Sequence, residues 1–247
     1  MDSPITRRNA IAVTGATVIG SLAGCLGGDS GVGTPDTTFG CDISSDTDDQ
    51  PTVDPASLSR PTLGSDSAAV TVDVFEDFSC SHCRDFALNV FPRLRADYLA
   101  VDDSDVRYRH FDAPIPVNDW SRPVANAARA VQDAHGAASF YAYAKRLYEN
   151  QSEYGWQLVG DLTAELSADV DPCSVLGAGS NQTYTSVIEA DKTVASERDI
   201  PGTPAVFVDG EMVDSEYGPI ADAIDRTLSR PSESPINDSI NDQPVIE

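Results

Sequence analysis

Two cysteines, Cys80 and Cys83, stand in the stretch Cys80-Ser81-His82-Cys83, at a spacing that lets their thiols close a small disulfide ring. The stretch follows a strand-like run and precedes a helix-like run. A cysteine at the start of a helix has its thiolate stabilised by backbone amides and by the helix dipole. The thiolate is the form that attacks disulfides. We therefore predict redox chemistry, with Cys80 as the exposed attacking thiol and Cys83 as the buried resolving thiol.

His82 lies between the two cysteines, where it can add positive charge or a hydrogen bond to the Cys80 sulfur, or remain a solvated loop histidine. The alternatives for the pair itself are a structural disulfide and half of a zinc site. Zinc usually takes four ligands, commonly two C-x-x-C pairs or one pair plus two histidines. No second C-x-x-C exists, and His110 and His135 are not at paired spacing. We predict no metal site and no bound cofactor.

The elements that must position this stretch are a strand, a long helix and a second strand. Residues 68–75 alternate, with valines on one face, which predicts a buried strand. Residues 84–99 have apolar side chains at helical spacing, and Pro92 predicts a kink because the periodicity continues beyond it. Residues 105–111 alternate again. These runs predict a βαβ unit with a right-handed crossover.

A helical region follows, and a strand–hairpin–helix unit ends the pattern. Helices are predicted from Ser121 to Gly136, near 139–148, near 158–166 and over about 182–198, with a boundary at Asp171-Pro172-Cys173. The last unit has an apolar strand over 205–208, a turn at Asp209-Gly210, a short strand over 211–213 and a helix over 218–229. The sequence predicts an α/β fold with a central mixed sheet, βαβ then ββα, around a helical insertion.

The composition is strongly acidic. The 247 residues carry a formal net charge of −24, and only Lys145 and Lys192 are lysines. This balance resembles that of proteins from extreme halophiles, especially haloarchaea, because a solvated carboxylate surface keeps a protein soluble in molar salt. Binding to a cationic partner explains the acidic composition less well, since the acidic residues are spread over the whole chain. Nucleic acid is not expected as a partner.

The N-terminus has the pattern of an export signal. In residues 1–24, the twin arginine Arg7-Arg8 precedes the apolar, small-residue run Ala10–Ala23, and Leu22-Ala23-Gly24-Cys25 resembles a lipobox. The apolar run is short for a membrane span, although an uncleaved anchor is the alternative. We expect a Tat-type lipoprotein signal, lipidation of Cys25 and a location on the extracytoplasmic face of the cell membrane.

The composition then divides the chain. Residues 25–66 are rich in Gly, Ser, Thr, Asp and Pro and predict a flexible acidic tether. Residues 67–230 form the predicted domain, with its helical insert at about 118–198. Residues 231–247 predict a disordered tail.

Cys41 and Cys173 remain once Cys25 is lipidated and the C-x-x-C pair is set aside. In an oxidising compartment we expect them to form a structural disulfide that clamps the N-terminal arm to the domain. Two independent thiols, or a thiol that serves as a second redox relay, are the alternatives.

The order of elements, with Cys80-Ser81-His82-Cys83 at the first helix and Gly202-Thr203-Pro204 before the third strand, resembles the DsbA-like thiol–disulfide oxidoreductases of the thioredoxin superfamily over about residues 66–230. The resemblance implies a nucleophile at Cys80 and a resolving thiol at Cys83. It also implies a cis-proline at Pro204 that faces the active site, with a trans turn as the alternative, and a substrate peptide that pairs with the backbone of Thr203.

The chain departs from the family pattern at two places. DsbA itself has proline after the first cysteine, where this chain has Ser81, and such changes shift the thiolate pKa. Many relatives have a buried acid six residues before the first cysteine, where this chain has Val74. Glu76 and Asp77 are nearer candidates for proton transfer, but we expect solvated loop acids because unpaired carboxylates are rarely buried.

The resemblance implies a dithiol oxidase that introduces disulfides into exported, cysteine-containing proteins and is reoxidised by a membrane quinone-linked partner. One alternative is a reductase or isomerase on the same fold. The other is a surface binding lipoprotein in which the cysteine pair is only structural. The reduction potential of the pair and its exchange with small thiols discriminate among the three.

Overall fold

The computed structural model describes residues 32, 39–41, 43, 52–100, 104–115, 118–167 and 169–230. The predicted signal peptide, the lipidation site Cys25 and the predicted tail at 231–247 lie outside these residues. Among the described residues, no helix has the length and apolar character that a membrane crossing requires.

A five-stranded mixed sheet lies at the centre, in the order β1-β3-β2-β4-β5. The strands are β1 (Thr62–Leu63), β2 (Val70–Glu76), β3 (Val106–Asp112), β4 (Ala205–Val208) and β5 (Glu211–Val213). β2 and β3 run parallel, and the other neighbouring pairs are antiparallel. The register pairs Val74 with His110 and Glu76 with Asp112 on adjacent strands.

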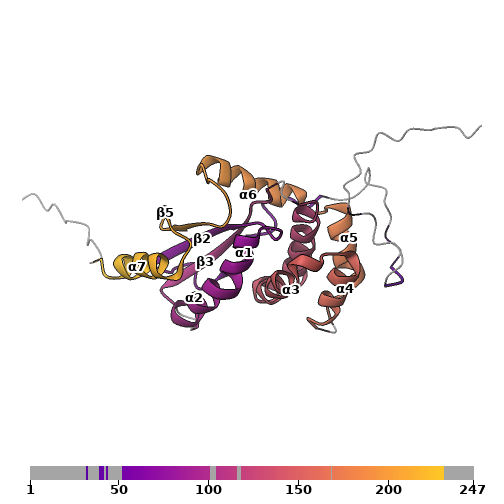
Figure 1. Cartoon of the computed structure of the whole chain (residues 1–247), viewed down its shortest axis with the longest axis horizontal. Coiled ribbons are helices and arrows are strands. Elements are labelled where there is room, and N and C mark those ends of the chain that lie inside the picture. Colours follow the sequence, from indigo (N-terminus) through magenta and orange to yellow (C-terminus); the bar gives the residue numbers. More distant parts are fainter. Residues whose placement is uncertain are drawn as a thin grey trace, which may run out of the picture. The chain divides into compact units, whose positions relative to one another are not determined.

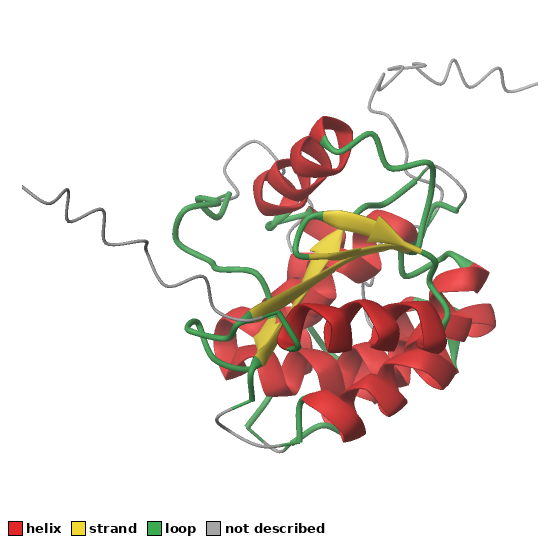
Figure 2. Ribbon diagram, turned by 90° about the vertical axis from the view of Figure 1, so that its left-hand side faces the viewer, coloured by secondary structure: helices red, strands yellow, loops and turns green. Residues whose placement is uncertain are grey.

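Helices cover both faces of the sheet (Figures 1 and 2). They are α1 (Ser81–Asp85), the π-helical η2 (Phe86–Val90), α2 (Phe91–Tyr98), α3 (Ser121–Glu149), the short 3-10 helix η3 (Gln151–Glu153), α4 (Trp156–Ala164), α5 (Pro172–Asn181), α6 (Thr185–Glu197) and α7 (Tyr217–Leu228). The predicted α/β fold with a helical insertion is confirmed, and the insertion consists of α3 to α6.

The alternation along β2 decides which helices lie on which face. Phe75 points to one face, where it packs with Phe111, Phe207 and Ala195 of α6. Val70, Val72 and Val74 point to the other face and join the larger core, to which α1, α2, α3 and α7 contribute. Glu76, two residues beyond Val74, therefore belongs to the larger core's face.

The helix after the cysteines is continuous from α1 to α2, but its middle turn is π-helical. Pro92 lies at the start of α2. Proline has no N–H to donate, and its ring clashes with the carbonyl four residues earlier, so a wider turn over Phe86–Val90 lets the helix continue. The kink predicted at Pro92 is therefore present as this π-helical turn.

The long helix α3 is broken once, at Gly136, whose backbone (φ 78°, ψ 177°) is not helical. A residue with a side chain adopts this φ rarely, so glycine suits the position. The break gives the two helices that the sequence predicts on either side of Gly136. Beyond it, Phe140 and Tyr141 point into the core.

Two predictions of the fold are wrong. The predicted tether extends to residue 66, yet β1 pairs with β3 at Thr62 and Leu63, and the Val53 N–H donates to the Thr183 carbonyl at 3.1 Å. The predicted helix over 182–198 begins only at Thr185, and a separate helix, α5, precedes it. Asp171 starts α5 by accepting from the Cys173 and Ser174 backbone N–H groups, and the left-handed backbone of Gln182 (φ 52°) ends it before α6 begins.

Candidate active site

Cys80 is the N-cap of α1, and Cys83 lies in the first turn. Cys80 has an extended backbone (φ −82°, ψ 123°), which ends the loop from β2 and starts the helix. Both thiols are free in this structure. Cys80 is 8% exposed and Cys83 is fully buried, so Cys80 is less open than the sequence suggests but remains the more accessible of the two.

The surroundings of Cys80 favour its thiolate. The largest cause is a hydrogen bond from the Cys83 thiol, which lowers the pKa of Cys80 against the opposing effect of burial. The Thr203 side chain and the backbone N–H groups of Cys83 and His82 lower it further, to about 4. The Thr203 hydroxyl is buried and has no hydrogen-bond partner among the described residues, so it is available to turn toward the sulfur. Cys80 is therefore ionised at neutral pH.

Cys83 is the opposite case. Burial raises the pKa of its thiol far above the ordinary value, and the bond to Cys80 and the negative charge of Glu76 raise it further. The backbone N–H of Asp77 donates to the Cys83 sulfur at 3.4 Å, which only partly offsets them. At neutral pH one thiol of the pair is thus ionised, and the other keeps its proton.

The structure brings Thr203 and Pro204 to the cysteines from the far end of the chain. The Thr203–Pro204 peptide bond is cis. Cys80 Sγ lies 3.3 Å from the Thr203 carbonyl oxygen, to which it donates only when protonated, so this backbone borders the sulfur. His82 contributes its backbone N–H, whereas its side chain is exposed.

Asp77 is buried, with 1% exposure, which contradicts the expectation of a solvated loop acid. Its carboxylate accepts from the Ser79 N–H at 2.8 Å, the Ile115 N–H at 2.9 Å and the Ser121 hydroxyl at 3.0 Å. Burial outweighs these bonds and raises the pKa of Asp77 to about 6. The carboxylate fixes the loop that carries Cys80, which explains why burial is tolerated.

Glu76 is also buried, again contrary to expectation. Its Oε2 lies 3.1 Å from His110 Nδ1, and Asp112 Oδ1 lies 3.1 Å from His110 Nε2. Burial alone would lower the pKa of His110, but the two carboxylates outweigh it and raise the pKa to about 9. His110 is therefore a cation at neutral pH, held between two buried carboxyl groups.

The charges continue across the core from Asp112. Arg129 of α3 is fully buried and binds Asp112 Oδ2 and Asp191 Oδ2, each at 2.5 Å. Asp191 in turn binds Arg60 at 2.8 Å. Sequence analysis missed this chain of charges. The available signal was the alternation of β3, which places His110 on the same inward face as Val106 and Tyr108.

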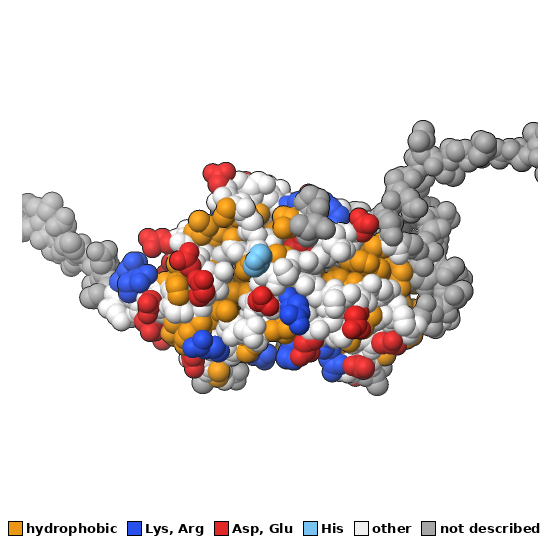
Figure 3. Space-filling model, in the orientation of Figure 1, with side chains coloured by type: hydrophobic (Ala, Val, Ile, Leu, Met, Phe, Trp, Pro, Cys, Tyr) orange, Lys and Arg blue, Asp and Glu red, His pale blue; other side chains and the backbone are white. Residues whose placement is uncertain are grey.

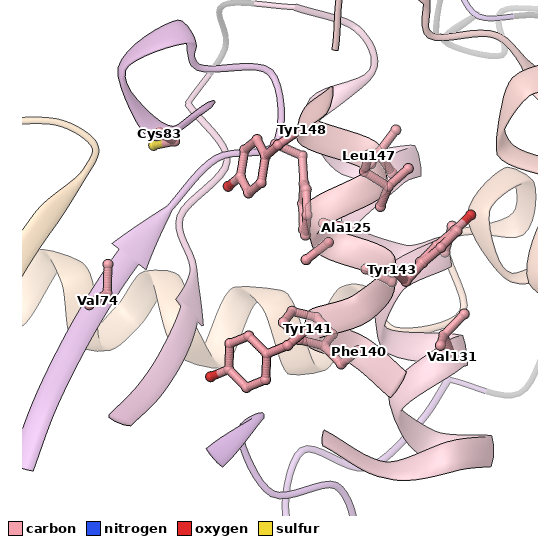
Figure 4. Packing of buried hydrophobic residues seen from close by; sticks show 14 of the residues in the cluster. Val74, Cys83, Ala125, Val131, Phe140, Tyr141, Tyr143, Leu147 and Tyr148 are labelled. Carbon is pink, nitrogen blue, oxygen red and sulfur yellow. The ribbon is translucent and has the colours of Figure 1, made fainter. Parts of the chain in front are cut away.

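A cleft of about 640 Å³ opens beside this chain, between the sheet and α3. Glu76 and His110 line it together with aromatic side chains that include Phe91, Tyr108 and Tyr148. Figure 4 shows Tyr141 and Tyr148 extending from α3 toward the strands, with Tyr148 near Cys83. Tyr148 therefore connects the lining of the cleft with the surroundings of the resolving cysteine.

The second cysteine pair lies elsewhere. Cys41 and Cys173 form a disulfide with an S–S distance of 1.97 Å and a Cα–Cα distance of 5.4 Å. It joins the N-terminal arm to α5. The described part of the chain contains no group of three or more His, Cys, Asp or Glu side chains arranged to hold a metal ion.

An ionised thiolate at a helix N-terminus, a buried partner thiol and a cis-proline on a mixed α/β sheet define a thiol–disulfide oxidoreductase with the thioredoxin fold. The thioredoxin family model matches residues 57–226. The chain belongs to this family.

Individual relatives agree with this assignment. The chain is 28% identical to disulfide bond formation protein D of Bacillus subtilis over 181 residues, which are 70% of this chain and 79% of that protein. The crystal structure of oxidised BdbD from Bacillus subtilis has a TM-score of 0.62 and 25% identity, and covers 72% of this chain and 96% of that one. DsbA of Chlamydia trachomatis shares the fold, with a TM-score of 0.61, 18% identity and coverage of 68% and 90%.

Proposed function

We propose that the protein is a dithiol oxidase that transfers the Cys80–Cys83 disulfide to exported proteins. The observation that carries the proposal is the asymmetry of the two thiols, because the pKa of Cys80 falls to about 4 while that of Cys83 rises. An ionised Cys80 held by several donors stabilises the reduced form. A stabilised reduced form makes the disulfide a strong oxidant. The similarity to disulfide bond formation protein D supports the same direction.

In the proposed reaction, a substrate thiolate attacks Cys80 Sγ, the Cys80–Cys83 bond breaks, and a mixed disulfide forms with Cys83 as the leaving group. A second substrate thiolate then attacks the substrate sulfur and releases Cys80 as a thiolate. The substrate loses two electrons and the protein gains them. The backbone at Thr203, next to Cys80 Sγ, is where an extended substrate would pair. The redox-active disulfide is the only redox group that this scheme needs, and a membrane quinone-linked partner would restore it.

We place this reaction on the extracytoplasmic face of the cell membrane, with Cys25 as a lipid anchor after Tat export. The lipobox-like Leu22-Ala23-Gly24-Cys25 and the twin arginine support this location. The net charge of −24 supports a halophilic source. Figure 3 shows acidic side chains scattered over one face rather than gathered in a patch, which fits a solvation role better than a cationic docking site.

The test is the reduction potential of the Cys80–Cys83 pair, equilibrated in glutathione buffers at high salt with the Cys41–Cys173 disulfide left intact. An oxidase requires a potential above roughly −200 mV. A value near about −270 mV would make the protein a reductase. Failure to exchange with glutathione at all would make the pair structural and would favour a binding lipoprotein.

A further inference from the structure

Three arginines surround one aromatic ring on the face of the sheet that lies away from the cleft. The guanidinium carbons of Arg60, Arg109 and Arg198 lie 4.3, 5.6 and 5.8 Å from the centre of the Phe111 ring. Phe111 belongs to the smaller core cluster, whereas its neighbour His110 lines the cleft on the other face. The chain has 40 acidic residues and only 16 lysines and arginines, so three cations at one place require a counter-charge. We call these three residues the arginine cluster.

The carboxylates beside the arginine cluster balance its charge only in part. Asp73 accepts hydrogen bonds from Arg109 Nε at 2.6 Å and Nη2 at 2.8 Å, and it also pairs with Arg198 Nη2 at 2.9 Å. Arg60 Nε donates to Asp191 Oδ1 at 2.8 Å, but the second oxygen of Asp191 already binds an arginine of α3. One carboxylate and a share of another therefore face three cations, which leaves a local excess of positive charge.

Several guanidinium N–H groups of the cluster have no acceptor in the part of the chain that the structure describes. Arg198 Nη1 is buried without a hydrogen-bond partner there. Arg60 donates only through Nε, and Arg109 only through Nε and Nη2. Glu197 and Asp199, the chain neighbours of Arg198, are exposed and form no ion pair with the cluster. Because a guanidinium stacks on a ring through its face, the N–H groups in its plane remain available to a ligand.

We propose that the arginine cluster binds a small oxyanion of the phosphate class through the free Nη groups of Arg60, Arg109 and Arg198. Guanidinium groups match the geometry of oxyanions, and a tetrahedral anion presents enough oxygens to contact three of them at once. The three side chains are 34%, 27% and 27% exposed, so a small ion can reach them. Their partial burial strengthens the attraction relative to that between solvated charges. The proposal is independent of the thiol chemistry.

The three arginines come from separate parts of the chain. Arg60 precedes β1, Arg109 lies in β3, and Arg198 is the C-cap of α6. An oxyanion shared among them would join these parts only in the folded protein. A ligand that binds the folded chain and not the unfolded chain raises the temperature of unfolding. Thermal unfolding therefore reports directly on the site.

The experiment compares sodium phosphate with sodium chloride at the same ionic strength and neutral pH. Isothermal titration calorimetry of the whole protein gives the dissociation constant of phosphate. Phosphate at about five times that constant should raise the midpoint of thermal unfolding by about 2–4 °C. Arg198→Lys keeps the positive charge but removes the guanidinium fork, so it should weaken phosphate binding by at least about tenfold.

Arg107→Gln is the matched control, because it removes a charge from the same face of β3. Its guanidinium donates to Thr71 and Asp66 and has no contact with the Phe111 ring. Phosphate binding should stay within about twofold of the wild type, as for substitutions away from a site. Equal weakening by Arg107→Gln and Arg198→Lys would reduce the effect to general attraction and overturn the proposal.

Phosphate also stabilises proteins because it is excluded from their surfaces, and every variant would share that effect. An equal rise of the unfolding midpoint in the wild type and in Arg198→Lys would therefore refute the site. A second measurement needs no variant. Crystals soaked in selenate, an oxyanion with an anomalous X-ray signal, should show a peak within hydrogen-bond distance of Arg60 and Arg198. Selenate bound only elsewhere would overturn the assignment.

Discussion

The molecule contains two cysteine pairs, and both include a cysteine near a helix N-terminus. Cys80 caps α1 itself, and the amides of the first turn stabilise its sulfur. Cys173 lies in the first turn of α5, but Asp171 is the cap there and its carboxylate accepts the Cys173 and Ser174 N–H groups. The N-terminus of α1 therefore supports a thiolate, whereas at the N-terminus of α5 a carboxylate takes the corresponding position. In this chain, the cysteine at the N-cap position has a free thiol with a lowered pKa, and the cysteine that follows a carboxylate cap is bonded in a disulfide.

The largest expected difference between the pairs is in activity. Cys80→Ser should reduce exchange with a reduced peptide substrate by more than about 10³-fold, because it removes the nucleophile. Cys83→Ser should instead accumulate the mixed disulfide, since no resolving thiol remains. Both effects are measured by gel shift and by oxidation of a fluorescent dithiol peptide. A Cys80→Ser variant that still oxidises the peptide would transfer the redox role to the Cys41–Cys173 pair.

The converse change should affect stability. Replacing Cys41 and Cys173 together by serine should lower the free energy of unfolding by about 2–4 kcal/mol, because the bridge closes a loop between residues 132 positions apart. Guanidinium-induced unfolding at a fixed high salt concentration measures this change in the free energy of unfolding. The exchange rate of the Cys80–Cys83 pair should be unchanged. A loss of exchange without loss of stability would show that the second pair is a redox relay and not a clamp.

The pH dependence of the reduction potential sharpens the contrast between the two active-site thiols. Reduction takes up two electrons, and above the Cys80 pKa of about 4 only Cys83 takes up a proton. The potential should therefore fall by about 30 mV per pH unit between pH 5 and 8. Below pH 4 the slope should approach about 60 mV, because Cys80 is protonated as well. The extra stability that the ionised Cys80 gives the reduced form is thus complete only above the ordinary thiol pKa of 9.0, declines as the pH falls below it, and is lost at about pH 4. A slope near 60 mV at pH 7 would contradict the low pKa.

Thr203→Val should have a smaller effect. It keeps the branched shape and the backbone carbonyl but removes the hydroxyl that lowers the pKa of Cys80. Loss of one hydrogen bond to a charged sulfur should make the thiol about tenfold less acidic. Absorbance of the thiolate during a pH titration measures the change. An unchanged titration would mean that the hydroxyl does not reach the sulfur.

The smallest effect should come from His82→Ala. The exposed side chain is removed, while the backbone N–H that faces the Cys80 sulfur is retained. The exchange rate should change by no more than about twofold, as for other surface substitutions. Measuring the rate at pH 5 and at pH 8 tests whether a protonated side chain contributes. A tenfold loss of the exchange rate would show that the histidine ring takes part in the reaction.

Local patterns in the sequence were sufficient for the elements around Cys80. Alternating valines predicted β2, whereas the approach of Thr203 and Pro204 to the cysteines was predicted from the resemblance to the DsbA-like oxidoreductases. The burial of Glu76 was not predicted, because it depends on His110, which is 34 residues away. A carboxylate with no known partner is expected to be solvated. The partner of Glu76 follows from the register of two parallel strands, and a single sequence does not show that register. β1 was missed because two residues cannot show a periodicity.

The buried Arg129 has a consequence for how the stability of the fold depends on salt concentration. At about 1 M salt the screening length falls to roughly 3 Å, so ion pairs on the surface lose most of their attraction. Arg129 and its two aspartates exclude water and mobile ions, and their attraction therefore persists at any salinity. These pairs join β3, α3 and α6. Their geometry would keep the insertion aligned on the sheet at low and at high salt concentration.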